Sequence, residues 1–206
     1  MSNLLVVFVR WPEPGKVKTR LAAEVGTERA AEIYRALATA TVAEARVGWD
    51  AGSLVLAGDP AGRAAEFGAW LGKDLRFVEQ EEGDLGERLQ RVTARLFDEG
   101  AATVTVIGSD CPLLNARLLG MARNAVEDGN FVLGPAADGG YWLIGLPRRA
   151  PELFAQVPWS TDQVFAVTRT RLEEKEEPCA LLPVLADVDL ARDLPAWLLG
   201  SGGGRA

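Results

Sequence analysis

The sequence predicts an α/β protein with a Rossmann-like, three-layer αβα arrangement around a mixed, mostly parallel sheet. Two observations predict this fold. Short apolar runs alternate with longer amphipathic stretches, which is typical of strands joined by helices. The runs are almost continuously apolar, as in strands that helices cover on both faces. The expected strands are residues 4–9, 53–57, 75–79, 103–108 and 131–134.

The helices expected between these strands cover residues 27–47, 61–71, 85–99 and 116–128. In the first of them, Ile33, Leu37 and Ala40 form an apolar stripe at helical spacing. Thr27 is placed to cap its N-terminus, and Glu28 follows in the first turn, where the helix dipole favours an acid.

The alternation changes after Gly134. A further strand-like run, residues 140–146, follows too soon for the helical crossover that a parallel strand needs, so we expect it to be antiparallel or outside the main sheet. A helix near residues 161–174, a strand near 180–185 and a helix from about residue 190 complete the chain. We find no repeat and no linker, which predicts one domain over residues 1–199 and a flexible glycine-rich tail over 200–206.

Composition excludes several classes of function. The chain has 206 residues, 22 basic and 29 acidic side chains, a net charge of −7 and no histidine. The acidic balance argues against nucleic acid as a partner. Without histidine, the Ser-His-Asp and Cys-His mechanisms and histidine-containing zinc motifs are excluded. Catalysis must then rely on carboxylates, Lys, Arg, hydroxyls, backbone amides or a hard metal ion.

The expected location is the cytoplasm. No apolar run is long enough to form an integral membrane segment, and the start of the chain lacks the basic region of a secretory signal. Cys111 and Cys179 form no Cys-x-x-Cys pair, which favours two reduced thiols.

A basic loop follows the first strand. It carries Arg10, Lys16, Lys18 and Arg20, and Gly15 lies within it. Ligands of open α/β sheets bind beyond the carboxyl ends of the strands, and cations there suit phosphate oxygens. The alternative is a solvated loop that happens to be basic.

Two acidic segments suggest a metal site. Asp110 follows the strand that ends near Gly108 and is placed to hold Mg²⁺ or Mn²⁺ together with substrate phosphate oxygens. In the segment Asp187-Val188-Asp189, an extended backbone puts both acids on one side, and Asp189 is the expected second ligand. The alternative for Asp110 and for Asp189 is helix capping.

Three further segments carry weaker signals. Asp138-Gly139-Gly140-Tyr141 is a turn signal that also presents a carboxylate and two bare amides beside an aromatic pair. Residues 83–88 form a turn that feeds a helix and is placed to line a nucleotide pocket. Residues 159–162 are better explained as a helix-capping cluster.

Six segments, in this order, resemble a bacterial family of GT-A-fold transferases, whose members are labelled glycosyltransferases or nucleotide-diphospho-sugar transferases. In this sequence they are FVRWPEPGKVKTRL (8–21), GDLGER (83–88), GSDCP (108–112), DGGYWLIGL (138–146), WSTD (159–162) and DVD (187–189). The resemblance covers the chain from about Leu4 to Leu198 and implies a seven-stranded sheet that binds a nucleotide at the ends of its first strands.

The resemblance also implies roles for individual residues. The residues implied to bind the nucleotide are Arg10, Gly15, Lys18, Arg20, Gly83, Asp84, Leu85 and Arg88. The resemblance places Asp138, Gly139 and Gly140 on the acceptor or donor-sugar side, and it implies Asp110 and Asp189 as the ligands of Mg²⁺ or Mn²⁺. We expect Gly139, Gly140 and Tyr141 to bind substrate. We expect Asp110 and Asp138 to be catalytic, with Asp138 orienting or deprotonating an acceptor hydroxyl. The sequence departs from the family patterns in two ways: Cys111-Pro112 follows Asp110 where an Asp-x-Asp motif is usual, and a Gly-x-Gly-Thr-Arg-like loop is missing.

The expected function is transfer from a nucleotide-activated small-molecule donor, a nucleotide-diphospho-sugar, to an acceptor that the sequence does not define. Two alternatives stay open. One is a nucleotidyltransferase that joins an NTP to a phosphorylated small molecule, and the other is a non-catalytic nucleotide-binding domain. The oligomeric state is equally undefined.

Overall fold

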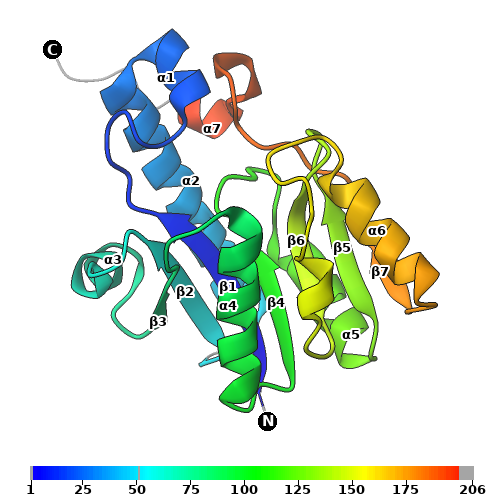
Figure 1. The fold of residues 1–206 in the computed structure, drawn as a ribbon. Coiled ribbons are helices and arrows are strands. Elements are labelled where there is room, and N and C mark those ends of the chain that lie inside the picture. The colour runs from blue at the N-terminus through cyan, green and yellow to red at the C-terminus, as the bar shows by residue number, and fades with distance from the viewer. Residues whose placement is uncertain (1, 51, 200–206) are drawn as a thin grey trace, which may run out of the picture.

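The computed structural model describes residues 2–50 and 52–199 (Figure 1). The expected tail at 200–206 lies outside the described residues. The elements are β1 (Asn3–Arg10), α1 (Thr19–Val25), α2 (Thr27–Gly48), β2 (Leu54–Asp59), α3 (Ala64–Leu71), β3 (Arg76–Glu79), α4 (Leu85–Asp98), β4 (Thr103–Ile107), α5 (Ala116–Glu127), β5 (Phe131–Pro135), β6 (Tyr141–Leu146), the 3₁₀ helix η1 (Pro151–Leu153), α6 (Val164–Glu174), β7 (Cys179–Leu181), the 3₁₀ helix η2 (Ala191–Asp193) and α7 (Ala196–Leu199).

Within the described residues, seven strands form one sheet in the order β3-β2-β1-β4-β6-β5-β7. Every pair is parallel except the two that β6 forms with β4 and β5. The short connection from β5 to β6 forces this reversal, as the sequence predicted. The Rossmann-like, mostly parallel fold is therefore confirmed.

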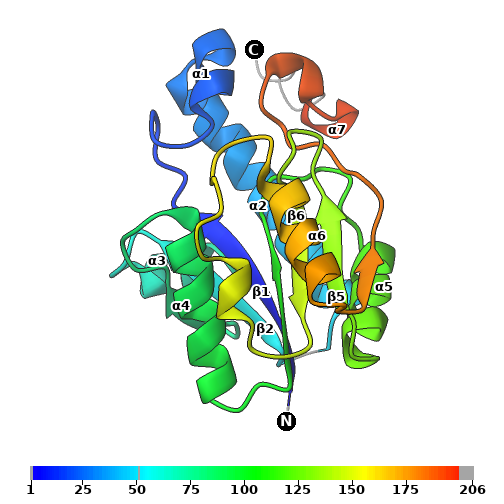
Figure 2. The ribbon, with the colours of Figure 1, turned by 45° about the vertical axis from the view of Figure 1, so that its right-hand side comes forward.

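Helices cover both faces of the sheet (Figures 1 and 2). Alternate residues of β1 point to opposite faces: Leu5 and Val7 pack with α2, α3 and α5, whereas Leu4 and Val6 pack with α4, η1 and α6. All four side chains are buried. This double burial explains why the strands lack polar alternation.

Some expected boundaries were wrong. Thr27 is the first residue of α2 rather than its cap, because Gly26 takes the N-cap position with φ 87°, and the Thr27 hydroxyl donates to Glu28 instead. The short helix α1 was not predicted as a separate element. The strand expected over 180–185 ends at Leu181, since Pro183 follows, and Leu185 forms only an isolated bridge with Ala136.

The helix expected from about residue 190 is two short pieces, η2 and α7, with Pro195 between them. α1 and α7 lie beyond the edge of the sheet at which the parallel strands end (Figure 2). Among the described residues, no helix has both the length and the apolar character needed to cross a membrane.

Candidate active site

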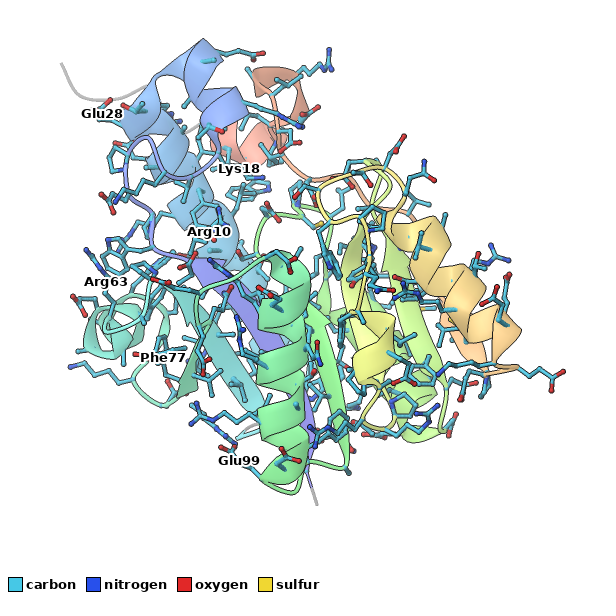
Figure 3. All side chains as sticks on the ribbon, viewed as in Figure 1. Arg10, Lys18, Glu28, Arg63, Phe77 and Glu99 are labelled. Carbon is cyan, nitrogen blue, oxygen red and sulfur yellow. The ribbon has the colours of Figure 1, made fainter. Side chains whose placement is uncertain are left out.

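A pocket of about 790 Å³ opens at the carboxyl ends of β1 and β4. Figure 3 labels two residues of its wall, Arg10 at the upper end of β1 and Lys18 beyond it. Most residues expected to bind a nucleotide or a metal line this pocket: Arg10, Lys18, Arg20, Gly83, Asp84, Leu85, Arg88, Asp110 and Asp189. Gly15 and the segment 138–141 are not part of its lining.

Lys18 lies at the centre of the charged end of the pocket. Its Nζ is 2.6 Å from Oδ2 of Asp110 and 3.6 Å from Oδ1 of Asp189, and only 8% of its side chain is exposed. Burial opposes the charge on this side chain, but the facing carboxylates of Asp110, Asp189 and Asp187 outweigh it and raise the pKa of the ammonium. Lys18 therefore carries its charge at neutral pH.

The backbone at Lys18 is left-handed, with φ 46° and ψ 50°. A residue with a Cβ adopts this conformation at a cost of about 1–3 kcal/mol when surrounding contacts enforce it. Here the residue occupies the N-cap position of α1, and its ion pair lies inside the pocket. The strained backbone of Lys18 thus coincides with the residue that forms the central ion pair of the pocket.

Asp110 is not a helix cap, because Asn115 caps α5 by accepting a hydrogen bond from the Leu118 amide. Instead its carboxylate faces Lys18, and its carbonyl accepts a hydrogen bond from the amide of Val188 at 3.3 Å. That bond joins the end of β4 to the segment with the other two acids. Val188 is fully buried, so this segment is fixed against the core.

The carboxylates of Asp110 and Asp187 and the thiol of Cys111 form a compact group, with one ligand atom from each lying within 4.8 Å of the others. Burial, followed by repulsion from Asp110, raises the pKa of Asp187 to about 6. The Cys111 thiol donates a hydrogen bond to Oδ1 of Asp187, and burial raises its own pKa. These two residues were not among the expected ligands, although Asp187 lies in a motif that the sequence singled out.

Asp189 is the second carboxylate that contacts Lys18. Its Oδ2 accepts a hydrogen bond from Arg20 at 3.1 Å, and the same carboxylate contacts Lys18. It is not part of the compact group around Asp187. Its side chain does not cap η2, since Asp193 accepts hydrogen bonds from the amides of Asp189 and Leu190.

Residues 83–88, which are the turn before α4 and the first residues of that helix, contribute to one wall of the pocket. Asp84 and Glu87 form a reciprocal capping box, which fixes the start of the helix. Arg88 donates to the carbonyl of Gly83 and, at 2.9 Å, to Oδ2 of Asp59. Asp59, at the end of β2, also contacts Arg10 at 3.4 Å. Asp59, which the sequence did not suggest, therefore forms ion pairs with two of the residues expected to bind the nucleotide.

Tyr34 and Gln80 also line the pocket, although neither was an expected site residue. Tyr34 of α2 accepts a hydrogen bond from the Arg10 amide and exchanges one with Ser109, so it ties the end of β1 to the end of β4. Burial raises its pKa to about 12. Gln80 lines the pocket with its amide held by the Ala57 carbonyl at 2.6 Å. Gln80 directly follows β3, and this position could have predicted it as a pocket residue. Tyr34 lies within a helix, and nothing in the sequence marked it as a site residue.

The segment 138–141 packs beside the pocket. Asp138 is exposed and accepts a hydrogen bond from the Gly140 amide, and its charge adds to the repulsion on Asp187. Gly139 has φ 88°, and a Cβ there would lie 2.3 Å from the carbonyl oxygen of Asp162. The Gly139 carbonyl accepts a hydrogen bond from Phe165. The glycine thus lets this turn dock against residues 159–162.

Tyr141 does not reach the pocket. Its ring packs edge-on against Trp159, with 6.2 Å between ring centroids, and burial raises the pKa of its hydroxyl. Trp159 itself lines the pocket, and its indole fills the space where a Cβ on Gly86 would lie. Residues 159–162, expected to be only a helix cap, therefore contribute to the pocket wall.

The model of one protein family matches residues 41–161, more than half of the chain. This family is DUF2064, described as an uncharacterized protein conserved in bacteria. The chain belongs to this family. No protein of curated function matches the sequence.

Several solved structures are similar to this chain. The chain is 36% identical to the "putative nucleotide-diphospho-sugar transferase" from Desulfovibrio desulfuricans G20, with a TM-score of 0.84, covering 92% of this chain and 84% of that one. Two more distant structures share the fold alone. Rv0371C from Mycobacterium tuberculosis H37Rv, in complex with manganese, has 20% identity, a TM-score of 0.52 and coverage of 93% and 96%. A nucleotidyl transferase from Methanothermobacter thermautotroptrophicus has 16% identity, a TM-score of 0.55 and coverage of 93% and 94%.

Proposed function

We propose that this DUF2064 protein is a divalent-metal-dependent transferase that uses a nucleotide-diphospho-sugar as donor. The observation that carries the proposal is the cluster of charges in the pocket: Lys18 and Arg20 form ion pairs with Asp110 and Asp189. A carboxylate oxygen of Asp187 lies within 4.8 Å of one of Asp110. Cations and a divalent ion together suit a diphosphate. The relative from D. desulfuricans, which carries the name of such a transferase, supports the same activity.

The residues present fit a hard divalent ion. Asp110 and Asp187 supply oxygen ligands. Burial and then repulsion from Asp110 raise the pKa of Asp187, and a bound cation would offset both effects. Cys111 keeps its proton and orients Asp187 through its hydrogen bond. We assign Asp110 and Asp187 as ligands of Mg²⁺ or Mn²⁺, and Asp189 as the partner that positions Arg20 and Lys18.

The bound ion would neutralise charge on the leaving diphosphate. Lys18 and Arg20 stabilise the same charge, so their contribution is expected mainly in turnover. Arg10, Gln80 and Arg88 line the remainder of the pocket and are assigned to the nucleoside. Asp138 is exposed beside the acids, and we assign it to orient or deprotonate an acceptor hydroxyl.

A nucleotidyltransferase is the second candidate, because the fold is shared with such an enzyme and the same charged groups would serve attack on an NTP. The two reactions differ in the phosphate bond that breaks. The absence of an Asp-x-Asp motif after β4 weakens the first candidate, whereas the missing Gly-x-Gly-Thr-Arg-like loop weakens the second.

A thermal-shift panel with and without Mn²⁺ tests the proposal. We expect UDP- or GDP-sugars to raise Tm by about 5–10 °C at roughly 100 times Kd, and only with the metal. A shift with CTP or GTP but not with the sugar nucleotides would favour nucleotidyl transfer. No shift with any of them would refute both candidates.

A further inference from the structure

Lys18, which we assign to the donor phosphates, forms an ion pair with Asp110, which we also assign as a metal ligand. Nζ of Lys18 lies 2.6 Å from Oδ2 of Asp110, and the Lys18 side chain is more than nine-tenths buried. The same Asp110 lies in the compact group with Asp187 and Cys111. In this arrangement the ammonium is directed at Asp110 and Asp189 and is not free to bind a phosphate.

We propose that Lys18 acts as an internal cation that occupies Asp110 when no divalent ion is bound, and that it leaves for the donor phosphate when the ion binds. This inference rests on the proposed function. A divalent ion at Asp110 repels a nearby ammonium, and the repulsion is strong in a partly buried site. One carboxylate is therefore expected to hold one of the two cations closely, but not both.

The residues around Lys18 provide a second place for its ammonium group, away from Asp110. Lys18, Thr19 and Arg20 all line the pocket, so an ammonium released from Asp110 stays at the wall where the phosphates are assigned. Asp189 already contacts it at 3.6 Å and can hold it there. Metal binding would then prepare the phosphate site through Lys18, in addition to the direct contact between metal and phosphate.

Arg20 is a matched control. It carries the same charge and contacts Asp189, but its side chain is 75% exposed and makes no ion pair with Asp110. Removing either cation makes the pocket more negative. Only removal of Lys18 also takes away the cation that is paired with Asp110.

The first experiment measures Mn²⁺ affinity without nucleotide, by calorimetry or by the EPR signal of free Mn²⁺. Lys18→Met is expected to bind Mn²⁺ about 10-fold more tightly than wild type, and Arg20→Met at most about 3-fold more tightly. Equal gains in both variants, or weaker binding by Lys18→Met, would overturn the proposal. Circular dichroism checks that each variant is folded.

A second experiment uses the wild-type protein and stays informative if Lys18→Met does not fold. Acylation of each lysine is followed by mass spectrometry with and without Mg²⁺. The rate at Lys18 is expected to rise about 5-fold with the ion as the population shifts to the released state, whereas Lys16, whose side chain is 70% exposed, should not change. An unchanged rate at Lys18 contradicts the proposal.

The two proposals fail in different ways. If wild type binds a sugar nucleotide with Mn²⁺ but Lys18→Met gains no Mn²⁺ affinity over Arg20→Met, the role of Lys18 is wrong and the proposed function stands. If wild type binds neither Mn²⁺ nor nucleotide, both are wrong.

Discussion

The ammonium of Lys18 lies 2.6 Å from a carboxylate oxygen of Asp110, although 92 positions separate the two residues in the chain. The contact joins the loop after β1 to the end of β4, which are neighbouring parallel strands. The contact brings together the basic loop and one of the acidic segments from which the sequence predicted a nucleotide and metal site. Four predictions concern this site and its supports.

Replacing Asp110 by Asn should abolish metal-dependent nucleotide binding. The amide keeps the shape of the carboxylate but removes the charge that both Lys18 and the divalent ion use. We expect at least about a 100-fold loss of Mn²⁺ affinity in calorimetry, since even residues that only support a ligand are worth 10–100-fold. Asp50→Asn, on the exposed pair with Arg123, is the control. Unchanged affinity in Asp110→Asn would show that the metal assignment is wrong.

Asp187 should make the metal-free protein less stable as the pH rises. Its pKa is raised from 3.8 to about 6, so the folded state binds more protons than the unfolded state between these values. The free energy of unfolding therefore falls as the pH rises from about 4 to 6. Asp187→Asn removes this penalty and should be about 3 kcal/mol more stable than wild type at pH 7.5, with no difference near pH 4.

Urea unfolding in EDTA at several pH values measures this difference. Asp50→Asn, at the exposed pair with Arg123, is the matched Asp-to-Asn control for folding. A stability gap between wild type and Asp187→Asn that stays constant over this range would contradict the raised pKa. The same substitution should lower Mn²⁺ affinity, so stability and function are expected to move in opposite directions.

Asp59→Ala should weaken nucleotide binding without touching the metal. The substitution frees Arg10 and Arg88, which share this carboxylate at the pocket wall. We expect nucleotide Kd to rise about 10-fold, the loss of a single charge-assisted contact. Mn²⁺ affinity without nucleotide should match that of wild type. Asp59→Asn should restore part of the nucleotide affinity, whereas a loss of Mn²⁺ binding in Asp59→Ala would mean a wider collapse of the site.

Gly139→Ala should destabilise the turn beside the acids. The position has φ 88°, and the new Cβ would lie 2.3 Å from the Asp162 carbonyl oxygen, so the free energy of unfolding should fall by about 2–4 kcal/mol. Gly120→Ala, in the middle of α5 with open space around it, should instead raise it by about 0.5–1 kcal/mol. Urea unfolding compares the two, and equal effects would refute the packing argument.

Much of the fold could be predicted because its cause is local. Continuous apolar runs indicate strands that are covered on both faces, and the short connection before residue 141 indicates the reversal of β6. The position of the pocket also follows, since parallel strands end at one edge and the motifs after β1 and β4 therefore meet there. Apart from the missed helix α1, the errors lie at element ends, where capping residues such as Gly26 and prolines such as Pro195 decide the boundary.

Which acids and cations pair could not be predicted, because pairing depends on how distant segments dock. The sequence placed Asp187 and Asp189 on one side of an extended segment and favoured Asp189 as the second metal ligand. Val188 is buried among residues of α1 and α2, and its amide donates a hydrogen bond to the carbonyl of Asp110 after β4, so that segment is fixed against both.

As a result, Asp187 lies with Asp110 and Cys111, and Asp189 lies with Lys18 and Arg20. The sequence by itself determined which chemical groups this protein carries and the edge of the sheet at which they gather. The tertiary structure alone decided which carboxylate each cation faces, because packing of the core sets those positions to within a few ångströms.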